Sequence, residues 1–232
     1  MSDLTGKVAV ITGAKGGLGS FVTRAFLQAG ASVAGVSRSI TTADVNHPRF
    51  AAIPAELSSA DGCDAVLGKA VSQFGRIDAV VHLMGGWAGG ANLEDTDDST
   101  FDKMLDLNLK PAFFVMRAAA KCMRGQGYGR LLAIGSKAAL EPQPHAGAYS
   151  VSKSALVALI RAFAVELRDA GVTANILLPS TMDTPQNRAA MPNADPSRWI
   201  HPCHVAETLV FLASDAAASI SGAAIPIFGA DL

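Results

Sequence analysis

The sequence predicts an α/β fold, a single doubly wound parallel sheet of seven strands with helices on both faces. Two observations predict it. Short runs of β-branched and apolar residues recur along the 232-residue chain, and each is followed by a longer segment of helical period. Half of the residues are hydrophobic, and no repeat, linker or low-complexity tract divides the chain, which favours one domain over residues 1–232.

The elements follow in alternation from these runs. The strand candidates are residues 8–12, 32–36, 50–53, 79–83, 130–135, 172–178 and 224–228. Helices are expected over residues 17–29, 59–74, 99–124, 147–170 and 204–214, whereas segment 39–49 is too broken by Asn46 and Pro48 for a full helix. In such a sheet the ligand lies at the carboxyl ends of the strands, where the winding reverses, so the loops there are the place for a functional site.

Composition excludes several classes of function. A net charge of −1 without a long run of one sign argues against a nucleic-acid groove or an anionic membrane surface as partner. Cys63, Cys122 and Cys203 are odd in number and lack CxxC spacing, so we expect neither disulfides nor a metal site, and a reducing cytoplasm. No room for a signal peptide precedes the strand run that starts at Lys7, and no apolar stretch reaches the ~18 uncharged residues of a membrane span.

The loop after the first strand, TGAKGGLG at residues 12–19, has the composition of a phosphate cradle of the Rossmann type. Gly13 permits the turn, Gly17 lets the backbone approach a pyrophosphate, and Gly19 lets the helix pack closely on the strand. Helix N-terminal amides favour negative charge at this place. A tight turn without a ligand is the alternative.

Tyr149 and Lys153 in AYSVSK stand four residues apart, so both side chains lie on one face of the predicted helix. A nearby ammonium favours the phenolate and is expected to lower the tyrosine pKa, which suits proton transfer near neutral pH. Ser136 closes the preceding strand in AIGSKAAL, where its hydroxyl is able to hydrogen-bond a carbonyl oxygen. Asn108, in DLNLKPAFF, lies just before Pro111 inside a predicted helix that is expected to kink there.

The TGxxxGxG spacing and these four residues resemble the short-chain dehydrogenase/reductase family, in order and across nearly the whole chain. The resemblance implies hydride transfer between a nicotinamide and a carbonyl or alcohol carbon. Tyr149 is then the general acid/base, Ser136 orients the substrate oxygen, Lys153 also binds the nicotinamide ribose, and Asn108 holds a water that links the lysine to solvent. The cradle residues Gly13, Gly17 and Leu18 would bind the dinucleotide.

Further cofactor contacts follow from the family's frames. LLPSTMDTP matches PGxxxTP, with Ser180 in place of the usual glycine, so Pro179 and Thr184 are candidates. The second strand ends at Ser37 and Arg38 rather than at an acidic residue, and with Lys15 these favour the 2′-phosphate of NADP(H) over NAD(H). The remaining candidates beside the cofactor are Glu56, Leu57 and Gly85.

The segment GGWAGGAN, with MDTPQNRAAMPNAD after the sixth strand, resembles one branch of the family, the dihydropteridine reductases. Trp87 is expected either to form a flat wall against the substrate or to anchor its loop. His82 stands where the family usually has an asparagine, and we expect a hydrogen-bonded core histidine. Segment 184–199 is the expected substrate lid.

Three functional hypotheses result. The first is an NADP(H)-dependent carbonyl reductase or alcohol dehydrogenase that acts on a small ketone or 3-oxoacyl-like substrate. The second is a quinonoid dihydropteridine or quinone reductase, and the third is a dinucleotide-binding sensor without turnover. Family resemblance also implies a homodimer or homotetramer that associates through the long helices 99–124 and 147–170.

Overall fold

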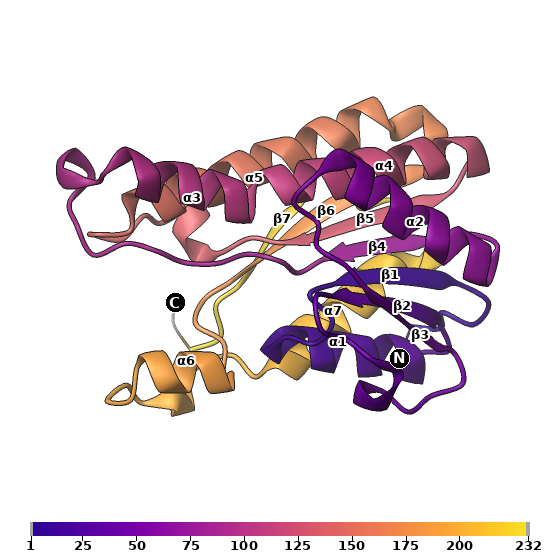
Figure 1. The fold of residues 1–232 in the computed structure, drawn as a ribbon, viewed down its shortest axis with the longest axis horizontal. Coiled ribbons are helices and arrows are strands. Elements are labelled where there is room, and N and C mark those ends of the chain that lie inside the picture. Colours follow the sequence, from indigo (N-terminus) through magenta and orange to yellow (C-terminus); the bar gives the residue numbers. More distant parts are fainter. Residues whose placement is uncertain (1, 231–232) are drawn as a thin grey trace.

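Seven parallel strands form one sheet in the order β3-β2-β1-β4-β5-β6-β7 in the computed structural model, which describes residues 2–230 (Figure 1). This is the predicted doubly wound fold. Each observed strand begins and ends within one residue of its predicted bounds. The strands are β1 Val8–Thr12, β2 Ser32–Ser37, β3 Phe50–Pro54, β4 Ala79–His82, β5 Gly129–Ile134, β6 Val172–Pro179 and β7 Ala224–Ile227.

Helices cover both faces of the sheet, each with its apolar side toward a separate core. Helices α1 (Gly17–Gln28) and α7 (Pro202–Ala213) pack together on one face. Helices α2 (Ala60–Phe74), α4 (Lys110–Gln126) and α5 (Gly147–Glu166) cover the other, as Figure 1 shows. Two inward-facing apolar sets are the reason that the strands read as nearly continuous hydrophobic runs.

The predicted helix over residues 99–124 is wrong as one element. It is divided into α3 (Asp98–Asn108) and α4, with Leu109 at φ −113° and ψ −54° between them. Pro111 lies in the first turn of α4, where its missing N–H costs nothing, so the chain starts a new helix there. The helix predicted over 147–170 ends at Glu166 and is followed by a 3₁₀ turn, Arg168–Ala170.

One helix lies where the sequence predicted no secondary structure. Helix α6 (Pro185–Ala190) belongs to the segment between β6 and α7. An isolated parallel β-bridge between Met182 and Ile200 joins the two ends of this segment. Segment 39–49 contains only a 3₁₀ turn, Thr42–Asp44, as predicted.

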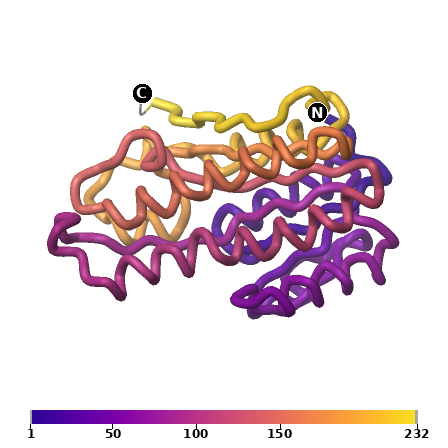
Figure 2. Tube along the Cα trace, turned by 90° about the horizontal axis from the view of Figure 1, so that it is seen from above, coloured from indigo at the N-terminus to yellow at the C-terminus, as the bar shows by residue number. Residues whose placement is uncertain are grey.

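The carboxyl ends of all strands open toward one end of the molecule, where α3 and α6 also lie in both Figure 1 and Figure 2. The winding reverses between β1 and β4. These two strands pair with each other, and Thr12 of β1 lies beside His82 of β4. This is the switch point where open α/β sheets bind ligands.

Helix α5 is the one described helix that is long and apolar enough to cross a membrane by length and composition, with a mean hydropathy of 1.4. Half of that helix is buried inside the protein, against β6. A core helix of an α/β sheet passes the same test, so its apolar composition is explained by burial.

Candidate active site

The glycine-rich loop between β1 and α1 has the geometry of a phosphate cradle. Gly13 has φ +71°, and a Cβ on Gly19 would lie 2.0 Å from the Gly13 carbonyl oxygen, so neither position accepts a side chain without strain. Helix α1 starts at Gly17, receives no side-chain cap from Gly16 and has no acidic residue in its first turn. Its first-turn amides are therefore suited to a pyrophosphate, and the site fits a dinucleotide.

The four catalytic candidates come together at the carboxyl ends of β4 and β5. Tyr149 and Lys153 share one face of α5, with the lysine Nζ 5.8 Å from the centre of the phenol ring. Ser136 follows β5 after one intervening residue, Gly135, and its hydroxyl is close enough to the phenol to affect its pKa. Lys153 donates to the carbonyl oxygen of Ile134, the last residue of β5, at 3.3 Å.

The expected lowering of the Tyr149 pKa is not found. Burial raises the pKa of the phenol above its ordinary value, and the hydrogen bond from Ser136 offsets this only in part. Burial also lowers the pKa of Lys153, to about 8. Both groups are removed from water, which disfavours both charged forms.

Asn108 joins the loop after β4 to helix α5 through its side-chain hydrogen bonds. Its Oδ1 accepts from the Gly86 amide at 2.9 Å, while its Nδ2 donates to the Gly86 carbonyl at 3.0 Å and to the Ser152 hydroxyl at 3.0 Å. A Cβ on Gly85 would lie 2.7 Å from the Asn108 Oδ1 and 3.1 Å from the Lys153 Nζ. Gly85 therefore allows the backbone to pass directly over the amide and the ammonium.

His82 braces the sheet in place of the asparagine usual in the family. It is completely buried, and its Nδ1 lies 3.1 Å from the Thr12 hydroxyl, which in turn accepts from the Leu83 amide at 3.2 Å. Its Nε2 has no hydrogen-bond partner within residues 2–230. Burial, and next the positive charge of Lys153, lower the pKa of His82 to about 3, so the imidazole is neutral at physiological pH.

Trp87 directly follows Gly86, which is hydrogen-bonded to Asn108, and lies in a loop that other residues hold in place. The indole is 63% exposed, so it does not anchor the loop by burial. The Gly90 amide instead donates to the His145 carbonyl at 2.8 Å. His145 has φ +62°, the one left-handed non-glycine residue among those described, and neither this conformation nor this contact has a signal in the sequence.

Asp44 is a charged residue beside Lys15, near the end of β2, that sequence reasoning missed. The Lys15 amide donates to the Ser37 hydroxyl at 3.2 Å, which joins the cradle to the end of β2. The Lys15 Nζ lies 3.0 Å from an Asp44 carboxylate oxygen. Arg38 is exposed and makes no hydrogen bond or ion pair in the described part of the chain. Asp44 lies seven residues beyond Ser37 in an irregular segment, so spacing alone did not place it here.

The remaining cofactor candidates differ in their exposure. Glu56 is exposed, whereas Leu57 and Leu18 are buried in the two cores, so those side chains do not line an open surface. Pro179 ends β6, and Thr184 caps α6 by accepting from the Asn187 amide at 3.2 Å.

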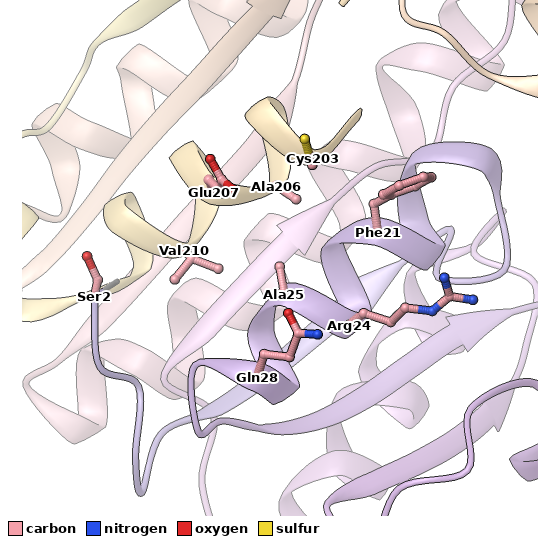
Figure 3. Close-up of a pocket in the computed structure, with 9 residues that line it drawn as sticks. All are labelled: Ser2, Phe21, Arg24, Ala25, Gln28, Cys203, Ala206, Glu207 and Val210. Carbon is pink, nitrogen blue, oxygen red and sulfur yellow. The ribbon is translucent and has the colours of Figure 1, made fainter. Parts of the chain in front are cut away.

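Two hollows lie away from these residues. One, of about 520 Å³, is open to solvent beside the contact between α1 and α7 (Figure 3) and is lined by Ser2, Phe21, Arg24, Ala25, Gln28, Cys203, Ala206, Glu207 and Val210. The other, of about 810 Å³, lies at the amino ends of β5 and β6, the opposite edge of the sheet. Neither includes a catalytic candidate, so the site is defined by side-chain chemistry at the strand ends.

Comparison with known proteins identifies the family. The sequence profile of the short chain dehydrogenase family matches residues 7–195. The chain is 31% identical to 2-dehydro-3-deoxy-D-gluconate 5-dehydrogenase of Escherichia coli, over 98% of this chain and 96% of that protein. It is 32% identical to D-threitol dehydrogenase of Mycolicibacterium smegmatis, over 97% of this chain and 93% of that protein.

A solved structure shows the same fold. It is 3-ketoacyl-(acyl-carrier-protein) reductase from Brucella melitensis in complex with NADH, 28% identical, with a TM-score of 0.87 over 99% of this chain and 100% of that one. Fold and site thus define an oxidoreductase that uses a nicotinamide dinucleotide. The chain belongs to the short-chain dehydrogenase family.

Proposed function

We propose that this protein is an NADP(H)-dependent reductase of a small ketone or 3-oxoacyl-like substrate, with Tyr149 as the general acid/base. One observation carries the proposal: Ser136, Tyr149 and Lys153 converge at the end of β5, beside a glycine cradle that fits a dinucleotide. A hydroxyl next to the phenol is what a carbonyl oxygen needs to be oriented for protonation.

A nicotinamide held by the glycine cradle would supply the hydride for the carbonyl carbon. The protein's own part is the proton. Because burial raises the pKa of Tyr149, the phenol is protonated at neutral pH and able to donate to the carbonyl oxygen. Ser136 donates a hydrogen bond to the same oxygen, and the ammonium of Lys153 stabilises the phenolate that forms.

The preference for the 2′-phosphate is supported by the cations at the end of β2. Arg38 is exposed directly after β2, and the Lys15 amide is bonded to the Ser37 hydroxyl, so both residues lie at the end of β2, where we expect the adenosine ribose. Steady-state rates with NADPH and NADH against ketones, 3-oxoacyl thioesters, quinones and quinonoid dihydropterin test the proposal. We expect ketone or oxoacyl reduction with a higher kcat/KM for NADPH. Binding of NADPH with no turnover on any of these would instead indicate a sensor.

A quinonoid dihydropteridine or quinone reductase is the second candidate, and the exposure of Trp87 favours it. Trp87 is 63% exposed and follows Gly86, which Asn108 binds, so its indole offers a flat face near the site on which a ring is able to stack. Ser136 argues for a carbonyl substrate, because a quinonoid pterin has no need of a hydroxyl aimed at a carbonyl oxygen. Faster reduction of dihydropterin than of every ketone in the same panel would select this candidate.

We propose further that segment 184–199 is a lid over the dinucleotide. It leaves and rejoins the fold at the Met182 and Ile200 bridge, and a Cβ on Gly17 would lie 2.7 Å from the Gln186 Oε1. The segment therefore lies directly against the cradle. Limited proteolysis should cut it more slowly with saturating NADPH, and equal cutting rates would contradict the lid.

The exposed apolar side chains of α4 and α5 support the proposal of a homodimer or homotetramer through this face. Phe113, Val151 and Val165 are large hydrophobic residues on the two helices, and all three are exposed. Light scattering of the purified protein measures the state directly, and a monomer at micromolar concentration would contradict it.

A further inference from the structure

The inference concerns the ion pair between Lys15 and Asp44, and it rests on the proposed use of NADP(H). The pair lies near the end of β2, where we expect the adenosine of the cofactor, and this region is called the adenosine end of the site. The Lys15 Nζ contacts both oxygens of the Asp44 carboxylate, at 3.0 Å and 3.1 Å, and donates to the Ser39 carbonyl at 3.0 Å. The side chain of Lys15, which would attract a 2′-phosphate, is thus already engaged.

Thr41 also holds the carboxylate in place. The Thr41 amide donates to the Asp44 Oδ2 at 2.8 Å, which is one half of a capping box on the 3₁₀ turn, and the Thr41 hydroxyl donates to the same oxygen at 3.1 Å. The hydrogen bond from Lys15, followed by the one from the Thr41 amide, holds the pKa of the Asp44 carboxyl below its ordinary value. At neutral pH the group is therefore a fixed negative charge.

We propose that Asp44 is a specificity-determining residue, which limits the preference for a 2′-phosphate by pairing with Lys15. A 2′-phosphate must break this ion pair to reach the ammonium, and it must also come close to a second negative charge. An adenosine with a free 2′-hydroxyl bears neither cost. Asp44 therefore reduces the difference in binding affinity between NADPH and NADH. Arg38, which no acidic group engages in the described chain, supplies the remaining preference.

The fragments adenosine 2′,5′-bisphosphate and 5′-AMP test this without any turnover. Isothermal titration calorimetry gives the Kd of each for the wild type, Asp44→Asn, Lys15→Met and the double variant. Asp44→Asn should tighten bisphosphate binding by about three- to fivefold, the range of an exposed ion pair, and change 5′-AMP binding by less than about twofold. In the Lys15→Met background the same substitution should have a smaller effect, because the competition is gone.

Asp106→Asn is the matched control. Asp106, in α3, forms an exposed ion pair with Lys110 at 2.6 Å, and α3 lies away from β2 and β3 in Figure 1. The Asp106→Asn substitution removes the same charge and leaves the residues around Lys15 and Asp44 unchanged. Equal bisphosphate affinity of Asp44→Asn and wild type, or an equal gain in Asp106→Asn, would overturn the role of Asp44. Failure of every variant to bind the bisphosphate more tightly than 5′-AMP would overturn the NADP(H) proposal as well.

Discussion

Asn108 and Gly86 form a reciprocal pair of hydrogen bonds, with the side-chain amide of one residue acting as a strand-like partner for the backbone of the other. Oδ1 accepts from the Gly86 amide at 2.9 Å and Nδ2 donates to its carbonyl at 3.0 Å. The pair joins the last turn of α3 to the loop that carries Trp87. The break between α3 and α4 therefore has a structural purpose, since it ends the helix where the amide meets the loop.

Asn108→Ala should lower the free energy of unfolding by about 2 to 4 kcal/mol, because it leaves the Gly86 amide and carbonyl without partners in a partly buried place. Urea unfolding measures this change, and hydrogen exchange of a peptide over residues 83–92 should become faster. Asn46→Ala, at an exposed residue, is the control. A loss below about 1 kcal/mol with unchanged exchange would mean that water replaces the amide.

Lys153→Met should abolish turnover and yet stabilise the fold. Burial lowers the pKa of Lys153 to about 8, so below that pH the folded protein bears the cost of a buried ammonium that the unfolded chain does not. The cost disappears as the pH rises toward the ordinary lysine value. At pH 7 the variant should gain about 1 to 3 kcal/mol in unfolding free energy, and the gain should shrink by pH 10. A destabilised variant at pH 7 would refute this account of Lys153.

His82→Asn should remove a part of the acid sensitivity of the fold. The pKa of His82 is lowered to about 3, so the unfolded chain takes up a proton near pH 6.5 that the folded protein refuses. Stability is therefore complete above pH 6.5 and is lost as the pH falls, at roughly 1.4 kcal/mol per unit for this group. Urea titrations from pH 7.5 to pH 4.5 should give a shallower slope for the variant. The same slope as in wild type, or an equal change in the exposed-site control His204→Asn, would contradict it.

Trp87→Ala should separate the two readings of the glycine-flanked indole. Because the side chain is 63% exposed, its removal should change the free energy of unfolding by less than about 0.5 kcal/mol. The KM of a ring-bearing substrate should rise, since the indole is worth about 1 kcal/mol in a stacked pair. The Kd of NADPH should stay within about twofold. Leu93→Ala, also exposed, controls for lost apolar surface near the same loop. A marked loss of stability with an unchanged KM would make Trp87 an anchor.

The strands and the cradle were predictable because their signals are local. A buried parallel strand is a short apolar run, and Gly13 and Gly19 are required by backbone geometry within eight residues of sequence. The pairing of Tyr149 with Lys153 follows from one turn of helix. The division of the helix at Leu109 was only half indicated by Pro111, since a proline fits equally well in the first turn of a new helix.

Contacts between distant segments were not predictable in the same way. Asp44 reaches Lys15 across 29 residues, and His145 binds the Gly90 amide from another loop, with no pattern at either end. The Tyr149 pKa was predicted in the wrong direction because a charge four residues away is visible in the sequence, whereas burial, which has the larger effect, is not. Tertiary surroundings decide such electrostatic properties.

The most direct test of the central claim is kcat/KM for NADPH-dependent carbonyl reduction by Tyr149→Phe, measured beside the Kd of NADPH from its fluorescence. The proposed role of the phenol as proton donor predicts a loss of about 10²- to 10⁴-fold in kcat/KM, with the Kd for NADPH nearly unchanged. Turnover within about tenfold of wild type at an unchanged Kd would show that the proton comes from elsewhere, and the proposed mechanism would be wrong.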